Sequence, residues 1–270
     1  MLDFLANQQR GMPVGLTEVA EAIGAHKSTV LRLLAPLVES GLVQKTGRSD
    51  YALGPTTIRW GQAYLGGLDL RSAARPVLLR LASLTQETIH LVVYDPPDVV
   101  YVEKIDSPRA VRMHSRVGDR QPIYCTAVGK AYLARLPSGS LTQSVGASLL
   151  GRTPHTITDL AALEREVGQV AARGFAIDDQ ENELEIRCVG AAILDDKGDP
   201  VAGVSVSAPA SRLTLSKAKE LGQLVTHAAT VLSAILGNPE ALRIQPHASG
   251  TGEDGQDQEP SGFGVSAFEN

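Results

Sequence analysis

Leu16-Thr-Glu-Val-Ala-Glu-Ala-Ile-Gly24-Ala-His-Lys-Ser-Thr-Val-Leu-Arg-Leu-Leu-Ala-Pro-Leu-Val-Glu-Ser-Gly41 is the stretch that decides the N-terminal fold. It predicts two short amphipathic helices joined by a tight turn at Gly24, where the backbone usually needs a positive φ. Thr17 is the expected N-cap of the first helix, and Val19, Ala20 and Ile23 form its apolar stripe. This is the helix-turn-helix pattern, in which a second helix is presented to the major groove of DNA.

The second helix of this pair has an apolar side and a polar side. Its predicted buried face consists of Val30, Leu31, Leu34 and Leu37, which recur at helical spacing. Polar side chains near its N-terminus fall outside that stripe, and residues of these types contact phosphates and base edges in DNA complexes. The candidate DNA-contacting residues here are His26, Lys27, Ser28, Thr29 and Arg32.

A strand-turn-strand pattern follows directly and predicts a wing. The strand candidates are Val43–Thr46 and Tyr51–Leu53, with Gly47-Arg-Ser-Asp50 as the turn between them. Lys45 and Arg48 are candidates for phosphate or minor-groove contacts. The alternative is a small helical domain without a nucleic-acid role, but two helices, a polar N-terminal face and a wing together favour a winged helix-turn-helix.

The charge of this region limits how it binds DNA. The whole chain carries a net charge of -5, and residues 1–60 hold six Lys or Arg against five Asp or Glu. Such a near-neutral domain lacks the basic excess of a non-specific nucleic-acid binder. One copy is therefore expected to bind weakly, and a homodimer on a double-stranded DNA operator is expected to be the functional form.

Length and composition set the remaining bounds. A chain of 270 residues accommodates two domains, and its two cysteines provide no disulfide framework. No signal peptide and no apolar run of membrane-spanning length is visible, so a cytoplasmic setting without membrane contact is expected. Residues 239–270 are predicted to be a disordered tail, because from about Pro246 the sequence is rich in Gly, Ser, Gln, Asp and Glu. Phe263 and Phe268 leave open a docking motif there.

The middle of the chain begins with two predicted helices. Pro55 to Gly67 has helical spacing, and Asp69 to Thr85 forms the next helix. Residues 55–70 are interpreted as a linker helix after the DNA-binding domain of residues 1–54. A helix in this position favours a contact between two copies of the chain, and a plain surface linker is the alternative.

From Glu87 the apolar period changes to that of strands. Predicted strands and helices alternate irregularly, which indicates an α+β domain over residues 71–238 with an antiparallel sheet. The predicted strands are Thr88–Tyr94, Val99–Ile105, Val111–Val117, Phe175–Asp178, Ile186–Leu194 and Val201–Ser207, and the predicted helices are Thr126–Leu136, Asp159–Ala172 and Ser216–Leu236.

With these segments in place, the chain resembles the IclR family of bacterial transcriptional regulators over about residues 1–238. The motifs that carry the resemblance are Lys27-Ser-Thr-Val-Leu-Arg-Leu-Leu34, Cys125-Thr-Ala-Val-Gly-Lys130, Thr153-Pro-His-Thr-Ile-Thr158, Arg173-Gly-Phe-Ala-Ile-Asp-Asp179, Arg187-Cys-Val189, Val204-Ser-Val-Ser207 and Ser211-Arg-Leu-Thr214. The resemblance implies an N-terminal winged helix-turn-helix and a C-terminal GAF-like effector-binding domain. It also implies a dimer or a dimer of dimers, with an organic or aromatic acid as effector, and it leaves open whether the chain is a repressor or an activator.

The resemblance also implies where the effector binds. The matching positions are Ala127, Val128, Asp178, Ile186, Cys188, Ser205 and Ser207. Backbone N–H groups at a helix N-terminus favour a carboxylate, and alternate residues of one strand share a face. Open alternatives are that the two serines face water, that Cys188 is a small buried hydrophobe and that Asp178 stays solvated.

Two departures and one rival class remain. The family usually has a longer first helix, here cut to about Met1 to Gln9, and Gly where Glu185 stands. The rival is an enzymatic or ligand-binding GAF-like protein with a vestigial DNA-binding domain, in which Cys125 would pair with His90, His114 or His155. No spacing requires such a pair or a metal site, so we assign no catalytic residue, metal or cofactor.

Overall fold

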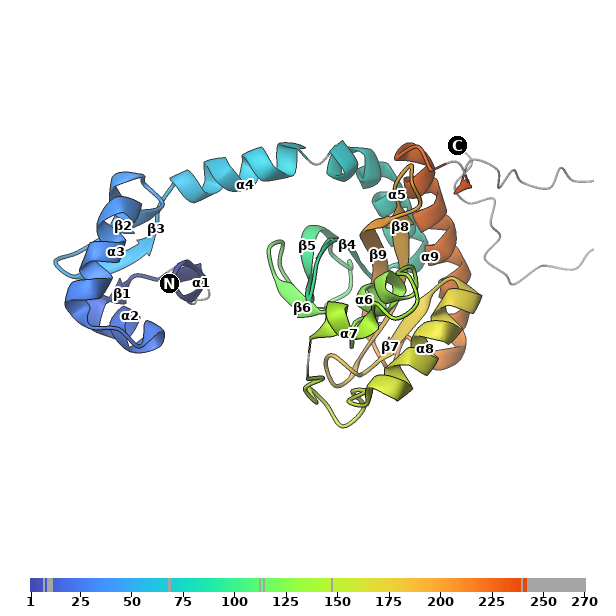
Figure 1. Cartoon of the computed structure of the whole chain (residues 1–270). Helices are drawn as coiled ribbons and strands as arrows, with labels where there is room; N and C mark the ends of the chain where they lie inside the picture. The colour runs from blue at the N-terminus through green and yellow to red at the C-terminus, as the bar shows by residue number, and fades with distance from the viewer. Residues whose placement is uncertain are drawn as a thin grey trace, which may run out of the picture. The chain divides into compact units, whose positions relative to one another are not determined.

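Figure 1 shows the computed structural model, which describes residues 1–6, 8, 12–67, 69–111, 113, 115–146, 148–238 and 240–241. The chain divides into two compact units, Met1–Asp69 and a second that starts at Leu70. The predicted disordered tail lies outside the described residues except for positions 240 and 241. Within the described part, no helix is both long enough and apolar enough to cross a membrane.

The first unit is a winged helix-turn-helix followed by a long helix. Its three short strands form an antiparallel sheet in the order β1-β3-β2, with Val14 opposite Tyr51 and Val43 opposite Leu53. The elements in chain order are α1 (Leu2–Ala6), β1 (Val14–Gly15), α2 (Leu16–Ile23), α3 (Lys27–Glu39), β2 (Val43–Lys45), β3 (Asp50–Leu53) and α4 (Thr56–Gly67).

The apolar stripes of α2 and α3 meet in one core with the wing. The buried residues that form this core are Leu5, Val14, Val19, Ala20, Val30, Leu34, Val43 and Tyr51. Gly24 ends α2 with a φ of 63°, as the turn prediction requires. The packing of α2 against α3 is therefore fixed by side chains that the helical period identifies.

Two details of this unit differ from the sequence predictions. Thr17 is not the N-cap, because Gly15, two residues earlier, holds that position, and the Gly15 N–H donates to Glu18 Oε2 at 2.8 Å. Leu31 is not part of the buried face and is 45% exposed. The buried stripe of α3 centres on Val30 and Leu34, and one residue along a helix turns the side chain by about 100°.

The second unit is an α+β domain built on a six-stranded antiparallel sheet. Its strand order is β6-β5-β4-β9-β8-β7. The elements are α5 (Asp69–Thr85), β4 (Thr88–Asp95), β5 (Asp98–Ile105), β6 (Arg120–Pro122), α6 (Ala127–Leu133), α7 (Leu141–Val145), α8 (Leu160–Arg173), β7 (Ala176–Asp179), β8 (Ile186–Leu194), β9 (Pro200–Pro209) and α9 (Leu215–Ile235).

Helices cover both faces of this sheet. α6 contacts β8 and β9 on one face, and α9 runs along the same two strands on the other side (Figure 1). Tyr94 and Gly203 lie on the α6 face, since the Tyr94 hydroxyl donates to the Val128 carbonyl and both residues lie beside α6. Strand alternation then puts His90, Ser205 and Ser207 on the α6 face as well.

The prediction of a strand over Val111–Val117 is wrong, because none of the described residues in this range lies in a strand. There the carbonyls of Met113 and Ser115 accept hydrogen bonds from Lys104 Nζ at 3.1 and 2.8 Å, so a side chain replaces the partner strand. The strand that pairs with β5 is β6, a few residues later. Arg112 and His114 lie outside the described residues.

Candidate functional site

The first candidate surface is the N-terminal part of α3. His26 has an extended backbone, and its carbonyl accepts the N–H groups of Thr29 and Val30, so it occupies the N-cap position. Lys27, Ser28 and Arg32 are exposed and Thr29 is half-buried. Ser28 and Arg32 are four residues apart, which places both on one side of the helix. The five predicted residues thus lie at the N-terminus and in the first two turns of α3, and Ser28 and Arg32 share one exposed side.

The wing holds the other two candidates. Lys45 ends β2, and Arg48 lies in the turn that the hydrogen bond from Thr46 N to Asp50 O closes at 3.0 Å. Both side chains are exposed. A guanidinium in the turn of the wing is suited to a phosphate, because it is always charged and its N–H groups match the phosphate oxygens.

The second candidate site is a small cavity on the α6 face of the sheet. All seven residues predicted to bind an effector line it, and they come from α6, β7, β8 and β9. Its volume is about 10 Å³, close to that of a single water molecule. The remaining lining residues, which the sequence did not single out, are Tyr101, Met113, Thr126, Asn182 and Glu183.

The N-terminus of α6 supplies one wall. Thr126 is its N-cap, with the side chain accepting from Gly129 N at 3.2 Å. The amides of Ala127 and Val128 fall in the first turn, where helix geometry provides no intrahelical acceptor. These N–H groups are therefore the donors that an anionic group in the cavity would meet.

Ser205 and Ser207 supply hydroxyls from β9. They are 4% and 2% exposed, so the interpretation that they face water is wrong. Ser207 Oγ lies 3.3 Å from His90 Nδ1, and His90 Nε2 lies 2.7 Å from Ser115 Oγ. The imidazole stacks on Tyr101 at 4.6 Å between ring centroids. Burial lowers the pKa of His90 to about 3, so the ring between these hydroxyls is neutral.

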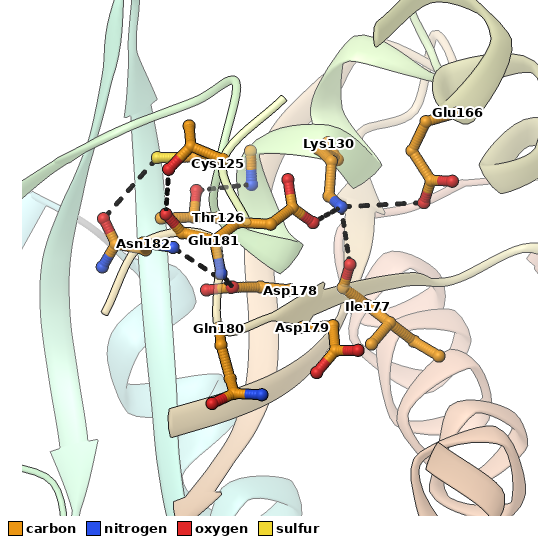
Figure 2. Close-up of polar contacts among 12 residues, drawn as sticks. Cys125, Thr126, Lys130, Glu166, Ile177, Asp178, Asp179, Gln180, Glu181 and Asn182 are labelled. Carbon is orange, nitrogen blue, oxygen red and sulfur yellow. Dashed lines mark hydrogen bonds and ion pairs between the residues drawn. The ribbon is translucent and has the colours of Figure 1, made fainter. Parts of the chain in front are cut away.

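Asp178 is a buried carboxyl in the wall. It is 2% exposed, which contradicts the interpretation that it stays solvated. Its Oδ1 accepts the N–H groups of Glu181 and Asn182 at 2.8 and 3.3 Å (Figure 2). Burial raises the pKa of Asp178 to about 7, with a further contribution from the neighbouring Glu181 carboxylate.

Lys130 ties α6 to the chain segment that carries Asp178. Figure 2 shows its ammonium group directed at three acceptors. Nζ donates to the Ile177 carbonyl at 2.6 Å and to Glu181 Oε1, and lies 3.6 Å from Glu166 Oε1. Lys130 is 1% exposed, and Glu181 Oε2 is buried without a hydrogen-bond partner among the described residues. The buried ion pair thus joins α6 to the loop after β7, and both of these segments contribute residues to the cavity wall.

The cysteines offer no nucleophile. Burial raises the pKa of Cys125 to about 12, and its thiol donates to Asn182 Oδ1 at 3.6 Å. Burial also raises the pKa of Cys188, which is partly buried in the cavity wall. Both stay protonated at neutral pH, whereas catalysis by cysteine requires the thiolate. Across the described residues, no group of three or more potential ligands is placed to hold a metal ion.

Glu185 adopts a backbone conformation that suits glycine. Its φ is 64°, in the left-handed region. Its N–H is bonded to Gln180 Oε1 at 3.1 Å, and its carbonyl accepts from Ala210 N at 2.6 Å. Those bonds hold a non-glycine residue where the related proteins are expected to use Gly.

A winged helix-turn-helix joined to an α+β domain with a lined cavity defines a class of DNA-binding transcriptional regulators. Residues 62–234 match the family described as bacterial transcriptional regulator IclR C-terminal, and residues 1–47 match the IclR helix-turn-helix domain. The chain belongs to the IclR family of transcriptional regulators.

Individual relatives agree with this assignment. The chain is 35% identical over 226 residues to the HTH-type transcriptional regulator KdgR of Escherichia coli, covering 83% of this chain and 86% of KdgR. It is 30% identical over 241 residues to the transcriptional repressor IclR of the same organism, covering 88% and 87%. The crystal structure of Thermotoga maritima IclR matches at a TM-score of 0.69 and 34% identity, covering 87% and 95%. These relatives are regulators and not enzymes, so the rival enzymatic interpretation is not supported.

Proposed function

We propose that this chain controls transcription in the cytoplasm by binding an operator through α3 and the wing, with an affinity set by a small organic acid in the α6 cavity. The observation that carries the proposal is the convergence of seven residues from four elements on one cavity. These residues are spread along the chain from Ala127 to Ser207. The fold brings them together, and no single local motif does so.

The chemistry of the lining supports an acid as effector. The first-turn amides of α6 favour an anionic group, and the hydroxyls of Ser205 and Ser207 are suited to donate to its oxygens. Met113 and Ile186 add apolar surface for a short carbon skeleton. The cavity has room for only about one water molecule, so any carboxylic acid requires the wall to open, and a compact acid requires the least movement.

On the DNA side, we assign direct readout to α3 and backbone contact to the wing. Arg32 is the residue best suited to a guanine edge, since its guanidinium is able to donate two parallel hydrogen bonds. His26, Lys27, Ser28 and Thr29 surround it at the helix N-terminus, where phosphates are favoured. Lys45 and Arg48 are assigned to phosphates or to the minor groove.

We further propose that the active form is a homodimer or a dimer of dimers on a two-fold site. A near-neutral binding domain gains affinity by pairing, because the second domain then binds at a high effective concentration. Ile58 and Trp60 on α4 are 68% and 54% exposed, so the helix has apolar side chains available for a contact between copies, on two different sides of the helix. Sedimentation at micromolar concentration should show no dominant monomer, and a stable monomer bound to a half-site would contradict this arrangement.

A thermal-shift screen of small carboxylic and phenolic acids tests the effector site. A specific ligand stabilises the folded state by RT ln(1 + [L]/Kd), so the shift reports affinity. The Ser205→Ala/Ser207→Ala variant should lose most of the shift, whereas Ser144→Ala, which lies in α7 away from the lining residues, should keep it. Equal shifts in both variants would place the ligand elsewhere.

A further inference from the structure

The effector cavity is acidic in composition. Asp178 and Glu183 contribute carboxyl groups to its wall, and Cys188 and Tyr101 add groups that are neutral at pH 7. Among its lining residues as the structure describes them, none is Lys, Arg or His. An anionic ligand therefore enters a space whose nearest ionisable neighbour is another acid.

The groups around Asp178 leave little positive charge for such a ligand. Lys130 on α6 is a cation whose charge acts on Asp178, but that ammonium is bound to Glu181 and to the Ile177 carbonyl. Glu181 itself faces Asp178 from the loop after β7 and raises its pKa, while Lys130 opposes this effect. Cys188 on β8, Tyr101 on β5 and Cys125 before α6 also interact with the Asp178 carboxylate. All three have raised pKa values and carry no charge near pH 7.

The N-terminus of α6 cannot neutralise a ligand carboxylate, because α6 has only seven residues. A helix N-terminus is equivalent to roughly half of a positive elementary charge. Two carboxylates that share a buried site do not both ionise, and the pKa of one of them rises strongly. A ligand carboxylate in the cavity would lie beside the carboxyl group of Asp178 on β7. We therefore expect Asp178 to take up a proton and become neutral when the ligand binds.

We propose that the cavity binds a small carboxylic acid together with one proton, which is shared between the ligand carboxylate and the carboxyl group of Asp178. This rests on the proposed effector site and adds the protonation state in which the site is occupied. The proton comes from solvent, no covalent bond changes, and the neutral carboxyl becomes a hydrogen-bond donor to the ligand. Asp178 Oδ1 remains the acceptor for Glu181 N and Asn182 N.

The proposal makes ligand affinity depend on pH. Asp178 with a pKa of about 7 is mostly protonated at pH 6 and ionised at pH 8.5. Affinity should therefore fall about tenfold per pH unit above 7, and about 30-fold between pH 6 and pH 8.5. A ligand that instead donates a hydroxyl to ionised Asp178 would bind more tightly as the pH rises over the same range.

Isothermal titration calorimetry of the full chain measures the proton directly. Lactate, pyruvate and benzoate are the probes, each titrated at pH 8 in phosphate and in Tris, whose ionisation enthalpies differ. The slope of the observed enthalpy against buffer enthalpy should correspond to nearly one proton taken up per site. Binding with no proton uptake would overturn the inference and leave the effector site intact. Failure of every probe to bind would contradict the proposed function itself.

Two isosteric variants locate the proton. Asp178→Asn keeps the acceptor oxygen for the loop amides and presents a permanent donor, so binding should persist with no proton uptake and little pH dependence. Glu183→Gln removes the other carboxyl of the wall and should still take up nearly one proton on binding, whatever its effect on affinity. Loss of proton uptake in Glu183→Gln, with uptake retained in Asp178→Asn, would overturn the assignment. The wild-type proton count decides the main claim even if one variant fails to fold.

Discussion

Gly190 on β8 lies directly beneath the backbone of Val128, so that a Cβ added at position 190 would come within 2.8 Å of the Val128 nitrogen. The same added atom would lie 3.0 Å from the Ala127 carbonyl carbon. The α6 N-terminus approaches the sheet this closely only because residue 190 has no side chain. That approach sets the distance between the amides of α6 and the hydroxyls of β9 across the cavity.

Gly190→Ala should therefore destabilise the second unit and weaken ligand binding together. Relief of the clash requires a backbone shift of α6, and overpacking of this kind costs about 1–3 kcal/mol. Gly168→Ala is the matched control, because nothing lies within 4 Å of an added Cβ in the exposed middle of α8. In the Gly168→Ala control the free energy of unfolding should rise by about 0.5–1 kcal/mol, since alanine is the better helix former. Denaturant unfolding compares the two, and equal stability would show that α6 is not held by this contact.

Lys130→Met should be among the most damaging single changes in the second unit. It leaves Glu181 buried without its cation, which typically costs about 3–5 kcal/mol of unfolding free energy. Adding Glu181→Gln to Lys130→Met should recover part of the loss, because no unpaired charge then remains. Arg120→Met removes ion pairs to Asp95 and Asp98 at the surface and should cost less than about 1 kcal/mol. A loss in Lys130→Met as small as that in Arg120→Met would contradict the role of the buried pair.

His90 gives stability a defined pH dependence. Its pKa of about 3 in the folded chain lies below the unfolded value near 6.5, so below pH 6.5 the unfolded state binds the additional proton. The stabilisation is complete above about pH 6.5 and is lost toward pH 3, by up to about 1.4 kcal/mol per pH unit. Asp178 acts with the opposite sign, because its folded pKa is raised, so variants must be compared with the wild type.

His90→Gln should flatten this acid dependence in urea unfolding followed from pH 7 to pH 4. His155→Gln changes an exposed histidine and should leave the dependence as it is in the wild type. An unchanged slope in His90→Gln would show that the imidazole between Ser115 and Ser207 takes up a proton without unfolding the chain.

Arg32 and Arg48 should affect DNA binding in different ways. The operator is first selected from random DNA with the wild type. On this operator, Arg32→Ala should lose about 1–3 kcal/mol of binding free energy and should relax the preference at one base pair. Arg48→Ala should weaken all sequences evenly and reduce the salt dependence. Arg165→Ala, an exposed change in α8, serves as the control. If gel shifts show that Arg32→Ala and Arg48→Ala both bind the operator with wild-type affinity, the assigned DNA-binding surface is wrong.

The sequence predicted most of the fold because its signals are local. Helical and strand periods located α2, α3, the wing and five of the six sheet strands, and Gly24 marked the turn with its positive φ. The failures are places where a distant side chain decides the structure. Lys104 takes the carbonyls of Met113 and Ser115, and no pattern within residues 111–117 reveals that.

The cavity was predicted through family resemblance rather than by physics. Alternation along β9 groups Ser205 with Ser207, but only the assembled sheet shows that both are buried. Tyr101 follows from the same alternation on β5 once the strand order is known, since it stacks on His90 of β4. The Lys130–Glu181 pair joins residues 51 positions apart, and sequence spacing gives no sign of it.

Coupling between the cavity and the operator is the central claim, and operator titration with and without a bound acid tests it most directly. A ligand shifts DNA affinity only through unequal affinity for DNA-competent and incompetent states, typically by about 5- to 150-fold. The account predicts such a shift in the wild type. In Ser205→Ala/Ser207→Ala it predicts unchanged DNA affinity without ligand and a response only at much higher ligand concentration. The same ligand response in wild type and double variant, or lost DNA binding in the variant without ligand, would contradict it.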